Sequence, residues 1–144
     1  MIAVTDTCTV SSQNLSPMAT VLFVDDHTCG SRDLIRTLRT AGHDVNVAAD
    51  ADEAIGLFWL QPADIVVLDC RLGRESDPAG DPAAALRRLS PDTPIIMMSS
   101  YCGVPCPQLR YADACLQKGD TSSNLLRTVE VMLCARRYGL CRSA

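Results

Sequence analysis

Short runs of apolar residues alternate along the chain with longer stretches in which apolar positions recur every three or four residues. The clearest run is Ile65–Leu68, which is unbroken and follows the turn-forming segment Pro62 to Asp64. Such a run is typical of a strand buried on both faces of a parallel sheet, and ligands of these sheets bind beyond the carboxyl ends of the strands. Asp69 follows the run directly and is therefore a candidate site residue. The alternative is an aspartate that caps the next turn.

The same pattern predicts further strands and helices along the chain. The other strands are Thr20–Val24, a strand containing Val45 and Val47, Ile95–Met98, and Ala114–Gln117. The predicted helices are Arg32–Thr40, a helix from the capping-box sequence Asp50–Glu53 to Pro62, Pro82–Leu89, and roughly Ser122–Arg137. Between Ser99 and Tyr111, Pro105 and Pro107 allow at most a stunted helix.

Strands that alternate with helices predict an α/β domain with a doubly wound, five-stranded parallel sheet. Right-handed crossovers restrict its topology. We expect the strand order 2-1-3-4-5, with a shortened or irregular fourth helix at the two prolines. The predicted domain covers residues 20–138, between an N-terminal tail at 1–19 and a C-terminal tail at 139–144.

Helical spacing also predicts which side chains face the core and which face solvent. In the last helix, Leu125, Val129 and Met132 share one face and should be buried. The opposite face of that helix is a candidate docking surface. Several arginines of the earlier helices are expected to lie on solvated faces, namely Arg36, Arg39, Arg87 and Arg88.

The composition excludes several classes of function. The chain has 144 residues, of which 47% are hydrophobic and 21% charged, as is ordinary for a soluble globular domain. A net charge of −4 argues against nucleic-acid binding, and no apolar run approaches the roughly 20 residues of a membrane span. No secretory signal begins the chain, so we expect a cytoplasmic protein. The eight cysteines form no Cys-x-x-Cys pair and should be reduced, mostly structural thiols rather than a zinc site.

Polar residues follow four of the predicted strands: Asp25 and Asp26, Asp69, Ser99, and Lys118. The carboxyl ends of parallel strands lie on one edge of a sheet, so these side chains can converge there. Three carboxylates repel one another, and a divalent cation such as Mg²⁺, which prefers oxygen ligands, relieves that repulsion. Lys118 adds a positive charge for a phosphoryl oxygen, and Ser99 adds a hydroxyl donor. Because a carboxylate can act as a nucleophile toward phosphorus, the set predicts phosphoryl transfer to an aspartate.

At these residues the chain resembles the receiver domain of bacterial response regulators, the proteins of two-component signalling. The resemblance covers Val21–Thr128 and is carried by the stretches Val21–Asp26, Ile65–Asp69, Pro94–Ser99 and Ala114–Lys118. It implies a flavodoxin-like fold with Asp69 as the phosphoacceptor, Ser99 as the switch hydroxyl and Lys118 as the phosphoryl-binding amine. It also implies a bound Mg²⁺ or Mn²⁺, with the ligands Asp25, Asp26, Asp69 and the backbone carbonyl of Arg71.

The chain departs from the family pattern at several positions. Leu72-Gly73 stands where Met-Pro is usual, and Ser76-Asp77 stands where Asp-Gly is usual. Cys115 holds the position of the aromatic switch residue, and Gly119 follows Lys118 where proline is usual. The phosphorylation set is therefore complete, whereas the usual set of readout residues is not.

These observations predict a receiver domain in a two-component or phosphorelay pathway, phosphorylated by a sensor histidine kinase or a phosphotransfer protein. Only residues 138–144 follow the last predicted helix, so we expect a stand-alone receiver that signals to an unknown downstream protein. The strand Ala114–Gln117 and the last helix form a candidate homodimer surface. We expect no enzymatic activity beyond phosphorylation and dephosphorylation of its own aspartate.

Two alternatives remain open. One is an interaction module of receiver fold that takes no phosphate, which the intact set of polar strand ends argues against. The other is a hydrolase that works through an aspartyl phosphate on Asp69. Such enzymes commonly need a second carboxylate two residues after the nucleophile, and Arg71 occupies that position here.

Overall fold

The computed structural model describes residues 18–25, 31–69, 82–99, 110–117, 119 and 122–137. Strands and helices alternate through most of these ranges. Their order is β1 (Thr20–Val24), α2 (Arg32–Thr40), β2 (Asp44–Ala48), α3 (Ala51–Leu60), β3 (Ile65–Asp69), α4 (Pro82–Leu89), β4 (Ile95–Ser99), β5 (Ala114–Gln117) and α5 (Ser122–Arg137).

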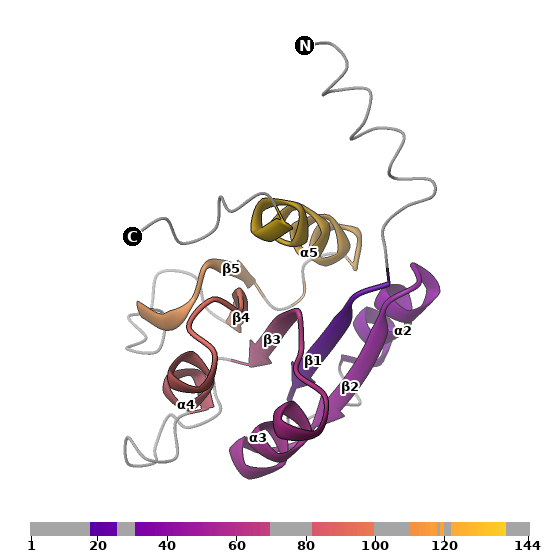
Figure 1. Ribbon diagram of the computed structural model, residues 1–144. Coiled ribbons are helices and arrows are strands. Elements are labelled where there is room, and N and C mark those ends of the chain that lie inside the picture. Colours follow the sequence, from indigo (N-terminus) through magenta and orange to yellow (C-terminus); the bar gives the residue numbers. More distant parts are fainter. Residues whose placement is uncertain are drawn as a thin grey trace.

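The strands form one parallel sheet in the order β2-β1-β3-β4-β5, which confirms the predicted doubly wound topology (Figure 1). Helices cover both faces of the sheet. On one face, Ala54 and Phe58 of α3 pack with Ala83 and Leu86 of α4. On the other face, α2 and α5 bury their apolar sides against the sheet through Ile35, Leu38, Leu125 and Val129. The predicted burial of Leu125 and Val129 is therefore confirmed, and Met132 is partly buried against the same core.

The three inner strands are apolar along their length and buried on both faces, as parallel strands between two helical layers must be. In β3 all residues are buried, and in β1 and β4 only one terminal residue is half-exposed. β5 differs, because none of its residues is buried. β2 and β5 form the two edges of the sheet.

Local sequence signals account for where the helices begin and end. The Asp50 carboxylate accepts a hydrogen bond from the Glu53 amide at 2.8 Å, and the Glu53 carboxylate accepts one from the Ala49 amide at 2.8 Å. This is the reciprocal arrangement that the capping-box sequence predicts, except that Glu53 accepts from the amide of Ala49 rather than from that of the N-cap residue Asp50. After α2, Gly42 has a φ of 102°. The amides of His43 and Gly42 donate to the carbonyls of Leu38 and Arg39, which is a Schellman ending.

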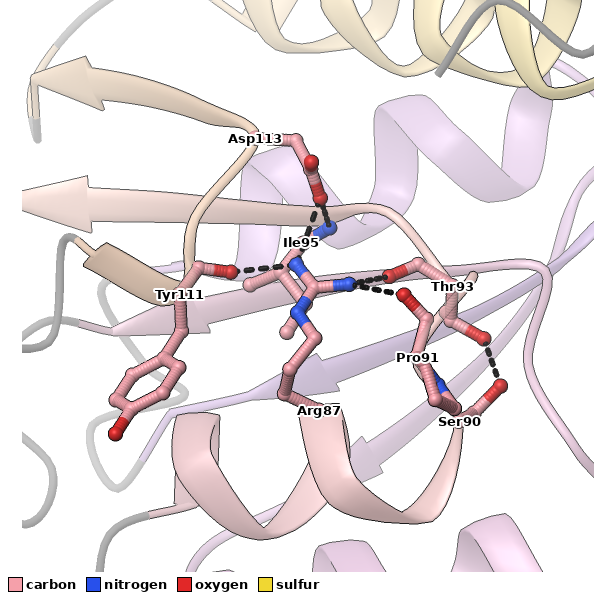
Figure 2. A network of polar contacts seen from close by, with 7 residues as sticks. All are labelled: Arg87, Ser90, Pro91, Thr93, Ile95, Tyr111 and Asp113. Carbon is pink, nitrogen blue, oxygen red and sulfur yellow. Dashed lines mark hydrogen bonds and ion pairs between the residues drawn. The ribbon is translucent and has the colours of Figure 1, made fainter. Parts of the chain in front are cut away.

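The structure corrects two of the predicted elements in detail and one side-chain prediction outright. β3 and β4 each extend one residue further, so Asp69 and Ser99 are the last residues of their strands. Arg87 does not lie on a solvated face, because its side chain is 11% exposed and pairs with Asp113 (Figure 2). The predicted stunted helix at Pro105 and Pro107 lies outside the described residues. Within the described ranges, no helix has the length and apolar character needed to cross a bilayer.

Candidate functional site

Two aspartates lie at the carboxyl edge of the sheet, one after β1 and one at the end of β3. These strands are neighbours, and Val24 pairs with Leu68 in the last step of their register. Asp25 and Asp69 each follow these paired residues directly in the chain. Asp25 is 2% exposed and Asp69 is 3% exposed. The two carboxylates are therefore buried on adjacent strands, where the sequence predicted that they would converge.

The backbone around both aspartates is held by the sheet. The Asp25 amide donates to the carbonyl of Ala48 at 3.0 Å, which ties the end of β1 to the end of β2. Asp69 pairs with Met98 of β4. Because each residue is fixed by a neighbouring strand, their side chains extend from a rigid edge rather than from a free loop.

Ser99 brings a third predicted residue to the same edge. It ends β4, one step beyond the Asp69–Met98 pair, and it is half-buried. On its other side Ser99 pairs with Gln117, the last residue of β5. The chain thus places Asp69 and Ser99 at the ends of β3 and β4, and Asp25 directly after β1, the strand on the other side of β3. Asp26, Arg71 and Lys118 lie outside the described residues, so their predicted positions are not part of this geometry.

Ser31 is a site residue that the sequence did not reveal. Its hydroxyl donates a hydrogen bond to Oδ2 of Asp25 at 2.5 Å, and it is only 3% exposed. Serine just before a helix normally accepts a capping hydrogen bond from the first turn. Here the side chain makes no such cap on α2. The position of Ser31 before Arg32 was the available signal, but it pointed to a helix cap rather than to a carboxylate partner.

The donor atoms at this edge fit a hard divalent cation. Asp25 and Asp69 offer carboxylate oxygens, which are the ligands that Mg²⁺ prefers. A divalent cation held between two carboxylates also relieves their mutual repulsion. Within the part of the chain that the structure describes, no group of three or more His, Cys, Asp or Glu side chains comes together. Of the four predicted metal ligands, the described ranges contain only Asp25 and Asp69.

The family model for the response regulator receiver domain matches residues 21–120, which is most of the predicted domain. This chain belongs to the response regulator receiver domain family. A comparison with curated proteins gave no match. The strand order, the buried aspartates and the family match therefore agree on one type of domain.

Solved structures share the fold of this receiver domain. NtrX from Brucella abortus, in a crystal structure with ADP, matches with a TM-score of 0.76 and 23% identity over 85% of this chain. The match covers 29% of NtrX, so this chain spans less than a third of that protein. A CheY-like receiver domain protein from Methanospirillum hungatei matches with a TM-score of 0.72 and 21% identity, over 85% of this chain and 99% of that one. The Francisella response regulator 1452 receiver domain matches with a TM-score of 0.68 and 24% identity, over 81% and 97% of the two chains.

Two departures of this receiver domain from its family have a structural counterpart. Gly119 has a φ of 94°, whereas the proline that is usual at this position is held near −65° by its ring. The backbone after Lys118 therefore adopts a conformation that proline cannot reach. Cys115, which replaces the usual aromatic residue, lies exposed on β5.

Proposed function

We propose that this receiver domain accepts a phosphoryl group on Asp69 in a Mg²⁺-dependent reaction and signals through contacts with other proteins. The observation that carries the proposal is the pair of buried carboxylates, Asp25 and Asp69, on adjacent strands with Ser99 on the next strand. A structural aspartate at a turn has no need of a second buried carboxylate beside it. A phosphoryl acceptor does, because one carboxylate attacks phosphorus while another helps to hold a cation.

The proposed reaction is an in-line transfer to the acceptor oxygen. An Oδ atom of Asp69 forms a bond to phosphorus, and the bond from phosphorus to the donor breaks, so the donor leaves with that bond's electron pair. For a phosphohistidine donor the broken bond is P–N and the imidazole leaves. A bound Mg²⁺ would supply charge neutralisation for the phosphoryl oxygens. Asp25, Asp26, Asp69 and the Arg71 carbonyl would hold it.

Other side chains have separate roles in this proposal. Ser31 fixes the orientation of the Asp25 carboxylate through its hydrogen bond. Ser99 donates its hydroxyl to a phosphoryl oxygen, and Lys118 pairs its ammonium group with another. These contacts form only after Asp69 is phosphorylated, so they favour the phosphorylated state and any rearrangement that brings Ser99 closer.

The proposed partners follow from the same chemistry. A sensor histidine kinase or a phosphotransfer protein in the cytoplasm would donate the phosphoryl group, and an unknown downstream protein or a second copy of the chain would receive the signal. We propose β5 and α5 as the surface for a second copy. Apart from phosphorylation and hydrolysis at its own Asp69, the domain would catalyse no reaction on a separate substrate.

Incubation with acetyl phosphate and Mg²⁺, read by intact mass spectrometry, tests the proposal. The wild type should gain one phosphoryl group and Asp69→Asn should gain none. Asp92→Asn is a matched control, because Asp92 is exposed and lies in the turn before β4, and it should label like the wild type. Equal labelling of wild type and Asp69→Asn would reject the assignment. A wild type that takes no phosphate under any donor would favour the interaction module.

A further inference from the structure

The edge strand β5 has little in its own sequence to fix its alignment with β4. Its residues are half-buried or exposed in alternation, and among the described strands it pairs only with β4. Where a strand has a buried apolar face, a slip of one residue is costly because it turns that face to solvent. In β5 only Ala114 and Leu116 approach the core, and both are partly exposed. The burial of apolar side chains therefore specifies the register of β5 weakly.

Asp113, immediately before β5, compensates with a two-point attachment to the first residue of β4, and Figure 2 shows the contact made by its carboxylate. Its backbone amide donates to the carbonyl of Ile95 at 2.8 Å. Its carboxylate Oδ2 accepts from the amide of Ile95 at 2.9 Å. Both backbone groups of Ile95 are thus bound by one residue, and a shifted strand would present Ala112 or Ala114, whose side chains accept no hydrogen bond.

Arg87 of α4 holds this attachment in place. Its guanidinium donates to Asp113 Oδ2 at 2.8 Å, and both side chains are 11% exposed. The same guanidinium donates to the carbonyls of Pro91 and Thr93 before β4 and to the carbonyl of Tyr111 before β5 (Figure 2). The Arg87 guanidinium therefore joins the end of α4 to the starts of β4 and β5. These starts are the amino ends of the strands, whereas Asp69 and Ser99 lie at carboxyl ends.

We propose that Asp113, held by Arg87, is a positioning residue that sets the register of β5 and thereby the reach of Lys118 in its proposed role as the phosphoryl-binding amine. Lys118 directly follows Gln117, which pairs with Ser99. Side chains alternate between the two faces of a strand, so a one-residue slip would exchange the faces of the β5 residues, and a two-residue slip would move the end of β5, which Lys118 follows, by about 7 Å along the strand. The consequence for phosphorylation rests on the proposed function; the register itself does not.

Hydrogen exchange of the full chain tests the register without any phosphate. Asp113→Ala should speed exchange of the β5 amides by at least about tenfold relative to those of β1 and β3. Val45→Ala is the matched control, because Val45 is 4% exposed and lies on β2, the opposite edge strand. It should lower overall stability while leaving the ratio of β5 to β3 exchange as in the wild type. Unchanged relative exchange of β5 in Asp113→Ala would overturn the proposal.

A double-mutant cycle tests the link to Lys118. Asp113→Ala should slow phosphorylation by acetyl phosphate by about tenfold, and it should have no further effect in a Lys118→Ala background. Mg²⁺ affinity should stay within about twofold of the wild type, because the proposed metal ligands follow β1, end β3 or follow β3 in the chain, and none belongs to β5. Asp113→Asn keeps an oxygen acceptor for the Ile95 amide and should restore most of the rate. An equal loss with and without Lys118, or the same loss in Val45→Ala, would show a merely structural role.

The two experiments separate the two claims. If the wild type takes no phosphate, the proposed function fails, and the exchange experiment still decides whether Asp113 fixes the register. If the wild type is phosphorylated and the Asp113→Ala effect persists unchanged in the Lys118→Ala background, the positioning role fails while the proposed function stands.

Discussion

The hydroxyl of Ser31 donates a hydrogen bond to the carboxylate of Asp25, and both side chains are almost completely buried. The contact joins the start of α2 to the end of β1 at the edge of the sheet that carries Asp69. A carboxylate that accepts a hydrogen bond on one oxygen is fixed in orientation, with its other oxygen directed elsewhere. In the proposed metal site, this hydrogen bond would orient Asp25 as a ligand.

Ser31→Ala should therefore weaken Mg²⁺ binding by about tenfold, because partners that orient a metal ligand contribute to affinity on this scale. Isothermal titration calorimetry gives the affinity directly. Thr40→Ala is the control, because it deletes an exposed hydroxyl at the last residue of α2. This variant should bind Mg²⁺ like the wild type. If Ser31→Ala and the wild type bind equally well, Ser31 serves only the packing of α2.

Removal of a proposed metal ligand should weaken Mg²⁺ binding more than removal of the Ser31 hydroxyl that orients Asp25. Asp25→Asn and Asp26→Ala should each abolish the heat of Mg²⁺ binding, and a chelator should stop phosphorylation of the wild type. Asp44→Asn, which removes an exposed carboxylate from the start of β2, should change neither. Calorimetry is preferable to tryptophan fluorescence here. Trp59 is 70% exposed near the end of α3. Gln61, which follows that helix, contacts Asp44 at the start of β2, so this end of α3 lies by the amino ends of the strands, away from the proposed metal site.

The Arg87–Asp113 pair should contribute strongly to stability. Arg87→Met keeps much of the side-chain volume but removes the guanidinium from the largely buried Asp113 carboxylate, and loss of one partner of such a pair costs about 3 kcal/mol. Urea denaturation measures the change in the free energy of unfolding. Arg88→Met removes the neighbouring, exposed arginine and should change stability by less than about 0.5 kcal/mol. Similar values for the two variants would mean that solvent screens the Arg87–Asp113 pair.

Gly119 should resist substitution for a backbone reason. Its φ of 94° lies in a region that residues with a Cβ rarely adopt, although among the described residues no atom lies within 4 Å of a Cβ placed there. Gly119→Ala should therefore lower the free energy of unfolding by about 1 kcal/mol. Gly56→Ala is a matched control in the middle of α3, where alanine also meets open space and should stabilise the helix instead. A stabilising Gly119→Ala would show that the segment after β5 can relax to another conformation.

The elements of this fold could be predicted because their signals are local. Ile65–Leu68 is apolar without a break, and Asp50–Glu53 and Gly42 mark helix ends by their own chemistry. The convergence of Asp25, Asp69 and Ser99 followed from topology alone, since parallel strands end at one edge. No measurement of side-chain geometry was needed for that step.

The supporting contacts could not be predicted because they depend on tertiary placement. Ser31 has the sequence context of a helix cap, and only the packing of α2 on the sheet brings it to Asp25. Arg87 has the helical spacing of a solvated residue, yet its partner Asp113 is 26 residues further along the chain. Sequence spacing places a charged residue on a face of a helix, but it does not say which segment covers that face.

The central claim is that Asp69 itself carries the phosphoryl group, and the most direct measurement identifies the modified residue. After phosphorylation with acetyl phosphate and Mg²⁺, borohydride reduces an aspartyl phosphate to homoserine, which peptide mass spectrometry can locate. We predict homoserine at position 69 and at no other aspartate. Homoserine at position 25 or 26, or a phosphate that survives the reduction on a serine such as Ser99, would contradict the account.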